Sequence, residues 1–592
     1  MLPAGIHGHL QACHRLAGLP LAIASTLLAL ASVTLVSRPC RADTLPDQES
    51  TPDDIPGEVA VDLVDDLTDA QVDGFSKAFG LVLQASSVLT ARTRIHHASV
   101  PAADVSALMG KLRGDARVQN VEPLAWVRAS WSPDDPLLAE QWHLAKVGAP
   151  AAWAWATGRG VTVAVVDTGI ACNDSGPFSR GTDLARTWCL AGFNVLNNEP
   201  SASDDNGHGT HVAGTIAQST NNGLGGAGVA FNARLLPIKV LDAQGRGTTV
   251  NVADGVRYAA DAGAQVINLS LGGGRASRVM RDAIVYARSK GVIVVAAAGN
   301  NGRVVEYPAA FDGVVAVSAT DSADRIASFS SRGPQVDIAA PGVKVLQQTV
   351  CNGGRDHCEV FSSLSGTSMA SPHVAGAAAL LMSVGVTDPV RVERILAESA
   401  RLPDGVGRGG EQYGAGILDV GAAVPRIVLL HAAVRLVLAA AIALIVVRRI
   451  RRNHGVVRPW RPAFLLSLLA FGPGLLVLAS FAVARVPLAV DLLARPVPEW
   501  DLIVGVSVHR WLPLANFLIP LAMSAVGFGF KRFRPAIAGV AIGTSAYLLS
   551  LPILRLTASD PKSLTLLAIW SVVNLAVCGW LAYLNLDERA TV

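Results

Sequence analysis

The chain of 592 residues has little net charge, because 49 Lys and Arg stand against 46 Asp and Glu and leave a formal charge of +3 at pH 7. This balance lacks the positive excess that binding a phosphate backbone requires, and it argues against a nucleic-acid partner. Cysteine is also scarce, with 7 in the whole chain. The length exceeds that of one ordinary core, so we expect about two to four domains.

Acidic residues are absent from the apolar runs of the C-terminal part, so a proton relay through these runs would have no carboxylate to use. Each run has about the 20 residues that cross a bilayer. The connections "RRIRRNHGVVRPWR" and "KRFR" are basic, and basic loops stay in the cytoplasm. We predict a membrane region over residues 427–592 with five spans, at about 427–447, 463–484, 511–530, 535–554 and 564–584.

Arg435 lies inside the first of these spans. Its side chain can snorkel to the membrane surface, which is the simpler reading, or it can face the other spans as a functional charge. The lipid bilayer is a predicted partner in either case. The location predicted is the inner membrane of a bacterial cell, with multiple passes, a cytoplasmic C-terminus and the preceding domain on the periplasmic or extracellular side.

The N-terminus carries Arg15 and then "LAGLPLAIASTLLALASVTLV", which predicts a secretory signal peptide over residues 1–42, with an uncleaved anchor as the alternative. Either way the following part is exported to an oxidising compartment. Cys13 and Cys40 fall in the signal and Cys578 in a span, so four cysteines remain. We expect these to form two local disulfides, Cys172 with Cys189 and Cys351 with Cys358.

Two folded regions are expected between the signal and the spans. An acidic, Pro-containing linker (43–56) precedes residues 57–130, where "EVAVDLV" alternates like a strand and "TDAQVDGFSKAFG" like a capped helix, which predicts a small α+β domain. Residues 133–425 contain the apolar runs "VTVAVVDTG", "QVINLSLGGG" and "VIVVAAAGNN", typical of parallel strands buried between helices. Such α/β folds bind and react at the carboxyl ends of their strands.

Four short stretches of this α/β region could together hydrolyse an amide, which needs a nucleophile, a base, a group that orients the base and donors for the oxyanion. "AVVDTG" offers Asp167, "DDNGHGTHVAGTIA" offers His208, "AAAGNN" offers Asn300 and "SGTSMASPHVAG" offers a serine. Taken alone, each has a simpler structural reading as a turn, a loop or a helix cap. Their joint presence in this order favours catalysis.

The same stretches resemble the subtilisin-like serine proteases (subtilases), and "INLSLGG", "FSSRGP" and "IAAPGV" extend the resemblance over residues 133–425. The resemblance implies a subtilisin-like α/β catalytic domain with a parallel sheet, preceded by a small α+β propeptide and followed here by an α-helical transmembrane region. It also implies that catalysis requires no cofactor and that the partners are protein or peptide substrates.

The residue roles follow from this resemblance. Ser368 would be the nucleophile, His208 the base and then the acid, and Asp167 the group that orients the imidazole, while the amide of Asn300 would donate to the oxyanion. The edge strand "LSLGG" would pair with an extended substrate. The pocket for the residue before the cut is expected to be open and apolar, lined by Ser270, Leu271, Gly272, Ala297, Ala298 and Gly299.

Two further features come from the resemblance. Residues 57–130 would be the chain's own propeptide and inhibitor, removed by self-cleavage between Arg128 and Pro133. "NNGLGGAGVA" at 221–230 resembles the family's calcium loop, with Asp183 and Asn222 as oxygen ligands of a structural Ca²⁺. An insertion before Asp183 departs from the family pattern, so a plain Gly-rich turn is the alternative.

The sequence therefore predicts an exported, membrane-anchored serine endopeptidase that matures itself. A catalytically silent peptide-binding or sensory protein on the same fold is the first alternative, and the presence of Asp167, His208, Ser368 and Asn300 argues against it. A transporter or channel with a protease attached is the second, and the absence of acidic residues from the spans makes anchoring the simpler reading.

Overall fold

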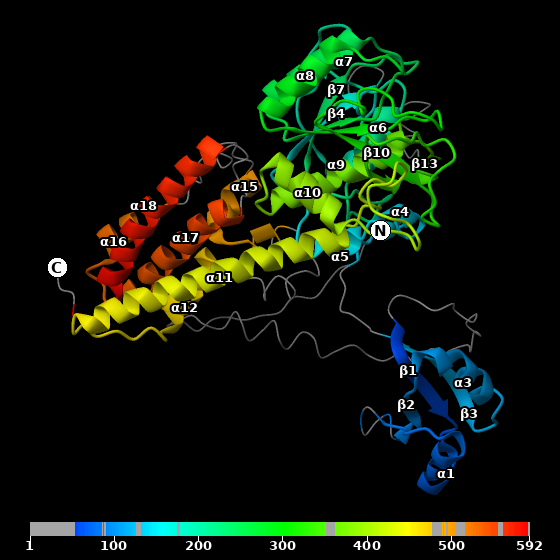
Figure 1. The fold of residues 1–592 in the computed structure, drawn as a ribbon, viewed down its shortest axis with the longest axis vertical. Coiled ribbons are helices and arrows are strands. Elements are labelled where there is room, and N and C mark those ends of the chain that lie inside the picture. The colour runs from blue at the N-terminus through cyan, green and yellow to red at the C-terminus, as the bar shows by residue number, and fades with distance from the viewer. Residues whose placement is uncertain are drawn as a thin grey trace, which may run out of the picture. The chain divides into compact units, whose positions relative to one another are not determined.

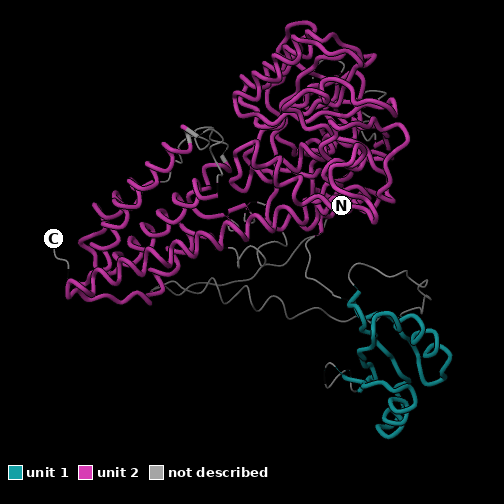
Figure 2. The backbone as a smooth tube through the Cα atoms, viewed as in Figure 1, with its two compact units in different colours: residues 1–129 teal, residues 130–592 magenta. Residues whose placement is uncertain are grey.

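The computed structural model describes residues 54–125 (apart from 86, 88, 89 and 91), 132–350 (apart from 175–177), 361–475, 488, 491–492, 495–504, 516–554 and 561–589. The chain forms two compact units, Met1–Ala129 and Ser130–Val592 (Figure 2). The predicted signal peptide and the predicted pair Cys351–Cys358 lie outside the described residues. Most of the expected cleavage segment does so too.

The first unit is the small α+β fold that the sequence predicts. Its antiparallel sheet has the order β2-β1-β3, and alternate residues of β1 point into a core that includes Val59, Val61 and Phe75. A capping box starts α1, where the backbone N–H of Thr68 donates to the side-chain oxygen of Gln71 at 2.8 Å. The elements are β1 (Asp54–Leu63), α1 (Asp69–Phe79), β2 (Ile95–Ser99), α3 (Val105–Leu112) and β3 (Val118–Ala125).

The second unit is built around an eight-stranded sheet whose paired strands are parallel, as the continuous apolar runs predict. The order is β11-β10-β9-β8-β4-β7-β5, with β6 also paired to β7. These strands are β4 (Thr162–Asp167), β5 (Trp188–Cys189), β6 (Phe193–Asn194), β7 (Arg234–Lys239), β8 (Val266–Leu269), β9 (Ile293–Ala297), β10 (Val314–Thr320) and β11 (Val336–Pro341). A separate antiparallel pair joins β12 (Val345–Gln348) to β13 (Phe361–Leu364).

Helices cover both faces of this sheet (Figure 1). Alternate residues of β4 enter different cores: Val163 and Val165 pack with α6 and α9, whereas Ala164 and Val166 pack with α7 and α8. This burial on both faces explains why the strand sequences show no polar alternation. The helices are α4 (Trp142–Lys146), α5 (Ala149–Trp153), α6 (His208–Ala217), α7 (Thr249–Asp261), α8 (Arg278–Ser289), α9 (Thr367–Ser383) and α10 (Pro389–Ser399).

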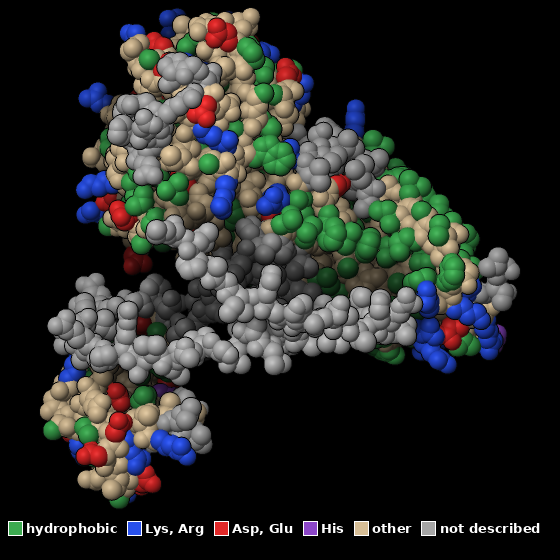
Figure 3. All heavy atoms as spheres, turned by 180° about the vertical axis from the view of Figure 1, so that it is seen from behind, with side chains coloured by type: hydrophobic (Ala, Val, Ile, Leu, Met, Phe, Trp, Pro, Cys, Tyr) green, Lys and Arg blue, Asp and Glu red, His purple; other side chains and the backbone are tan. Residues whose placement is uncertain are grey.

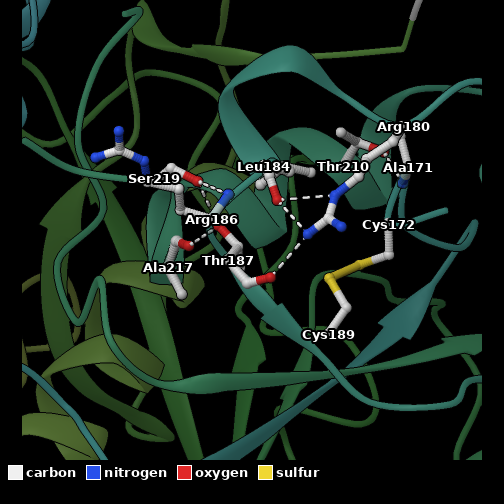
Figure 4. The surroundings of a disulfide bond; sticks show 10 residues. All are labelled: Ala171, Cys172, Arg180, Leu184, Arg186, Thr187, Cys189, Thr210, Ala217 and Ser219. Atoms are coloured by element: carbon white, nitrogen blue, oxygen red, sulfur yellow. Dashed lines mark hydrogen bonds between the residues drawn. A yellow bond between two sulfur atoms is a disulfide. The ribbon is translucent and has the colours of Figure 1, made fainter. Parts of the chain in front are cut away.

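One of the two predicted disulfides is present among the described residues. Cys172 and Cys189 are bonded, and their sulfurs lie 2.02 Å apart. Beside the bond, the guanidinium of Arg180 donates to the carbonyl oxygens of Leu184 and Thr187 at 2.6 and 2.9 Å (Figure 4). The disulfide thus ties the segment after β4 to β5 at the edge of the sheet.

The predicted boundary between catalytic and membrane regions falls inside one helix, α11 (Val420–Arg452). Three described helices are long and apolar enough to cross a membrane by length and composition: α11, α17 (Arg534–Leu554) and Leu564–Leu586 of α18 (Pro561–Leu586). The other two predicted spans contain shorter apolar helices, α12 (Pro462–Phe471) and α16 (Leu518–Gly527), and extend into residues outside the described part. A short helix, α15 (Trp500–Val504), precedes α16.

Arg435 faces the interior of this helical region. Its side chain is 2% exposed and pairs with Glu499 at 2.7 Å, while its Nε donates to the hydroxyl of Ser550 at 3.1 Å. The guanidinium also lies over the ring of Tyr547. Of the two readings of Arg435, the structure therefore favours the inward-facing charge over the snorkelling one.

The described part of the helical region has a cluster of exposed basic residues at one end. Hydrophobic side chains cover the sides of the helices, and Lys and Arg gather at the end away from the α/β domain (Figure 3). Arg461 pairs with Glu588 at 2.6 Å, so the connection after α11 and the C-terminus meet at that end. The exposed basic residues there are Arg448, Arg449, Arg451, Arg452, Arg458, Lys531 and Arg532.

Candidate active site

Three predicted site residues follow neighbouring strands. Asp167 ends β4, Ser270 comes directly after β8, and Asn300 lies three residues beyond β9. The order β9-β8-β4 and the parallel pairing bring these carboxyl ends to the same edge of the sheet. The topology therefore gathers the polar side chains that the sequence singles out, at the edge where α/β folds bind their ligands.

Asp167 and His208 are in direct contact. Nδ1 of His208 lies 2.7 Å from Oδ1 of Asp167, whose side chain is fully buried. The same carboxylate oxygen accepts the backbone N–H of Thr168 at 2.7 Å. Burial opposes the charged imidazole, but the negative charge and hydrogen bond of Asp167 prevail and raise the pKa of His208 above its ordinary value. The pair is thus suited to hold a proton on the imidazole.

Asp204 fixes the start of α6, whose first residue is His208. Its Oδ1 accepts the N–H of Gly207 at 2.9 Å, and its Oδ2 accepts the N–H and the hydroxyl of Thr210 at 2.9 and 2.6 Å. These bonds satisfy N–H groups that an α-helix leaves open at its start. Asp204 was not predicted from the sequence as a site residue, although it lies in the stretch "DDNGHG" that contains His208.

Ser368 is the second residue of α9, and its hydroxyl donates to the carbonyl oxygen of Ser270 at 3.2 Å. Among the described contacts, no hydrogen bond joins Ser368 to His208. The start of α9 is fastened to β8 by a chain of side chains: Ser371 donates to Asn268 at 2.7 Å, Asn268 to Ser270 at 2.9 Å, and Ser270 to the Ser368 carbonyl at 2.7 Å. These hydrogen bonds hold Ser368, the candidate nucleophile, at the carboxyl end of β8.

The amide of Asn300 has a fixed orientation. Its oxygen accepts both the N–H and the hydroxyl of Thr367, at 2.9 and 3.0 Å. The NH₂ group is thereby directed away from Thr367, and Asn300 lines the same cavity as Ser368. The N–H of Ser368 belongs to the first turn of α9, where N–H groups lack helical partners. The site therefore has two N–H donors available for an oxyanion.

The substrate-side residues line two neighbouring cavities. A cavity of about 290 Å³ is bordered by Ser368, Asn300 and four predicted residues: Leu271, Gly272, Ala297 and Gly299. Ser270 borders a second cavity, of about 480 Å³, together with His208. Ala298 is fully buried in the core below. The segment after β8 is not an edge strand as expected, because β8 pairs on both sides and residues 270–274 continue beyond the sheet.

The first cavity also contains a carboxylate, that of Glu306. This corrects the expectation of an apolar pocket, which was based on the small side chains of its two walls. Glu306 lies six residues after Asn300, outside every stretch that pointed to the chemistry. The motifs therefore gave no reason to predict Glu306 as a pocket residue.

The two predicted calcium ligands, Asp183 and Asn222, are in contact, and a hydrogen bond joins them directly. Asn222 turns its NH₂ group to Asp183 at 2.8 Å, because the amide oxygen accepts the N–H of Leu224 at 3.1 Å. The other oxygen of Asp183 accepts N–H groups of Gln218 and Gly226. These contacts are nitrogen donors, whereas Ca²⁺ takes oxygen ligands. In the described part of the chain no group of three His, Cys, Asp or Glu could hold a metal.

The comparisons with known proteins agree with this geometry. A subtilase family model matches residues 158–416. Thermitase of Thermoactinomyces vulgaris is 44% identical over 257 residues, which are 43% of this chain and 87% of thermitase. Subtilisin BL of Lederbergia lenta is 47% identical over 242 residues, 40% of this chain and 83% of that protein. A thermophilic serine proteinase of Bacillus sp. (strain AK1) is 39% identical over 308 residues, 51% and 73% of the two chains. The chain belongs to the subtilase family and is a serine endopeptidase.

Proposed function

We propose that Asp167, His208 and Ser368 act as the catalytic triad of a membrane-anchored, self-maturing endopeptidase. The observation that carries the proposal is the 2.7 Å contact between Asp167 and His208, at an edge of the sheet where Ser368 and Asn300 border one cavity. Rotation of the Ser368 side chain away from the Ser270 carbonyl would present its hydroxyl to Nε2 of His208.

In this mechanism His208 takes the proton of Ser368 as the serine oxygen attacks the substrate carbonyl, and it later gives the proton to the leaving amine. Asp167 stabilises the imidazolium that forms in between. The developing oxyanion would accept hydrogen bonds from the amide of Asn300 and the N–H of Ser368. Loss of one such donor slows serine proteases by about 10² to 10³. None of these steps needs a metal.

The helical region would hold the protease at an inner membrane. The basic residues gather at the end of the helices away from the α/β domain, and positive segments stay in the cytoplasm. We therefore place the C-terminus and the connection after α11 inside, and the catalytic domain on the periplasmic or extracellular side. The bilayer is then a partner through α11, α17, α18 and the two shorter helices.

The first unit would serve as propeptide and inhibitor. It has its own sheet and core and ends near residue 129, which lies in the segment where cleavage is expected. A small domain with its own core can dock as a unit on the enzyme and be removed by one cut.

Structural calcium at the 221–230 loop stays a prediction of the family resemblance. Asp134 and Asp135 accept N–H groups of this loop, the first from Gly223 at 2.8 Å and the second from Asn221 at 2.7 Å. These hydrogen bonds can hold the shape of the loop without a cation, and the proposed mechanism uses no calcium ion.

Membrane fractionation and N-terminal sequencing of the wild-type chain and Ser368→Ala test the proposal. We expect both proteins in the membrane fraction, with the wild type starting between residues 129 and 133 and the variant retaining residues 43–128. An identical N-terminus in both proteins would contradict self-maturation. Release of either protein into the soluble fraction would contradict anchoring.

A further inference from the structure

The segment that carries Glu306 is fastened to both walls of the cavity beside Ser368. The N–H of Glu306 donates to the carbonyl of Ala298 at 2.8 Å, beneath the wall that follows β9. Its neighbour Tyr307 exchanges backbone hydrogen bonds with Gly273, at 2.8 and 2.9 Å, on the wall that follows β8. Glu306 is half-buried. Its backbone position is therefore set by the two elements that build the pocket.

The carboxyl group of Glu306 stands between these walls. A Cβ placed on Gly272 would come within 2.9 Å of Oε2, and a Cβ placed on Gly299 would come within 2.7 Å of Cδ. A side chain at either position would require the carboxyl group of Glu306 to move. The two glycines and Glu306 thus form one arrangement, with the charge held inside the cavity that Ser368 borders.

This carboxylate has a polar partner but no cation. Asn301 donates its NH₂ group to Oε1 at 2.8 Å. The amide oxygen of Asn301 is held by the N–H of Arg303 at 2.7 Å and the hydroxyl of Ser331 at 3.1 Å, which fixes the direction of the NH₂ group. Within the described ranges, no Lys or Arg forms an ion pair with Glu306, and Oε2 accepts no hydrogen bond. One oxygen is therefore free to bind a ligand.

We propose that Glu306 makes the enzyme select Lys or Arg as the residue before the scissile bond. The inference rests on the proposed function, since it needs substrate bonds to be cut at Ser368. A substrate ammonium or guanidinium would gain a charge-assisted hydrogen bond from the carboxylate. An apolar side chain would instead cover Glu306 and leave its charge without a counter-charge, so the same residue also rejects apolar side chains at this position.

The sequence of the chain contains one matching bond in the expected place. Arg128 is the only Lys or Arg between Arg117 and Lys146, and it lies in the segment where self-cleavage is predicted. The pocket and the segment point to the same cut by independent routes. On this proposal, the sequence puts the maturation cut at the Arg128–Ala129 bond.

The test uses the full-length enzyme in detergent and two fluorogenic peptides that differ only in the residue before the cut, Arg or Leu. We expect the wild type to cleave the Arg peptide with the higher kcat/KM. Glu306→Gln keeps the size and loses the charge, and it should lower kcat/KM for Arg by about 10- to 100-fold while leaving Leu unchanged or improved. Glu199→Gln, an exposed residue elsewhere, removes the same charge and should change neither value.

Failure of this inference can be told apart from failure of the proposed function by labelling Ser368 with a fluorophosphonate. If Ser368 is labelled but Glu306→Gln leaves the Arg-to-Leu ratio unchanged, the role of Glu306 is overturned alone. If neither peptide is cleaved and Ser368 is not labelled, the proposed function falls and takes this inference with it. Equal loss on both peptides would make Glu306 structural and would also overturn the inference.

The maturation site has its own readout. N-terminal sequencing of the wild type should find Ala129 as the first residue, and Arg128→Gln should slow maturation or move it to another bond. A wild-type enzyme that starts at any other residue would contradict the assignment of Arg128.

Discussion

At the scale of single residues, the hydroxyl of Thr367 connects Gly299 to Asn300, the proposed oxyanion donor. Its oxygen accepts the N–H of Gly299 at 3.1 Å and donates its proton to Oδ1 of Asn300 at 3.0 Å. Thr367 is fully buried, so no solvent competes for these bonds. In the proposed mechanism it is a positioning residue, because it would act on the reaction only through the amide of Asn300.

Thr367→Val should therefore lower kcat with little change in KM. The variant keeps the backbone bond to Asn300 but loses the hydroxyl, and a lost hydrogen bond of this kind is worth about 1 kcal/mol, or about 5-fold in rate. Thr367→Ser retains the hydroxyl and should stay near the wild type. Steady-state kinetics on one peptide measure both, and a serine variant as slow as the valine variant would contradict this role.

The contact between Asp167 and His208 predicts the acid side of the pH profile. Protonated His208 cannot act as a base, and its pKa lies above the ordinary value of 6.5, so activity should fall as the pH drops through that raised pKa. The midpoint of kcat/KM should lie above pH 6.5. Asp167→Asn removes the charge that raises the pKa, and should lower both the rate and this midpoint. A wild-type midpoint at or below 6.5 would contradict the assignment.

The site residues that could be predicted from the sequence lie in sequence motifs, whereas the one that was missed depends on contacts between distant segments. Asp167, His208, Ser368 and Asn300 each lie inside a contiguous stretch that resembles a subtilase motif. Glu306 has no such context, because its role depends on the space that Gly272 and Gly299 leave open across the pocket. A contact of that kind arises only when distant segments fold together.

At the scale of elements, buried histidines connect α4 to α9 and α6 to the strand pair β12–β13. Nδ1 of His143, on α4, lies 2.8 Å from Nε2 of His373 on α9, and His211 on α6 contacts the carbonyls of Val345 and Ser362 at 3.0 Å. All three imidazoles are inaccessible to solvent. Burial lowers the pKa of His211 and His373 to about 4, and it lowers that of His143 well below 6.5.

These histidines should make the catalytic domain lose stability in acid. Above pH 6.5 they are neutral in both the folded and the unfolded chain; below it the unfolded chain binds protons that the folded one excludes. The free energy of unfolding should fall from about pH 6.5 toward pH 4, by up to about 1.4 kcal/mol per pH unit for each residue. Denaturant titration of Ser368→Ala measures it without self-digestion, and stability that is flat between pH 7 and 5 would contradict the prediction.

The elements themselves were predictable to different degrees. The parallel strands follow from the apolar runs, and the helix that starts at Thr367 follows from the motif around Ser368. The predicted end of the domain near residue 425 did not coincide with an element boundary, because α11 continues from the α/β domain into the apolar region. An uninterrupted helix contains no turn residues that would mark where the α/β domain ends and the apolar helical region begins.

At the scale of the second unit, the segment between the apolar helices α12 and α16 is bonded to the catalytic domain. Asp491 is fully buried and accepts the hydroxyl of Thr157 at 2.8 Å and the guanidinium of Arg159 at 2.7 Å. A Cβ on Gly160 would lie 1.6 Å from the carbonyl of Leu502, so the two backbones are in contact. This contact holds the α/β domain in a fixed position relative to the apolar helices.

Asp491→Ala should therefore destabilise the whole unit. The change leaves the buried guanidinium of Arg495, 3.7 Å from Asp491, without this anion, and Arg159 loses it as well. Breaking a buried pair costs about 3–5 kcal/mol. Thermal unfolding of the Ser368→Ala protein in detergent should show a clearly lower midpoint with Asp491→Ala. Asp254→Ala, at an exposed position of α7, is the control and should change it little. Equal midpoints for the two variants would contradict the role of this contact.

The most direct test of the account is to label the full-length protein in membranes with a fluorophosphonate and to locate the adduct by peptide mass spectrometry. The account predicts one adduct, on Ser368, that is lost in Ser368→Ala and strongly reduced in His208→Gln, because the serine is nucleophilic only with its base in place. No adduct, or an adduct on another serine that persists in Ser368→Ala, would contradict it.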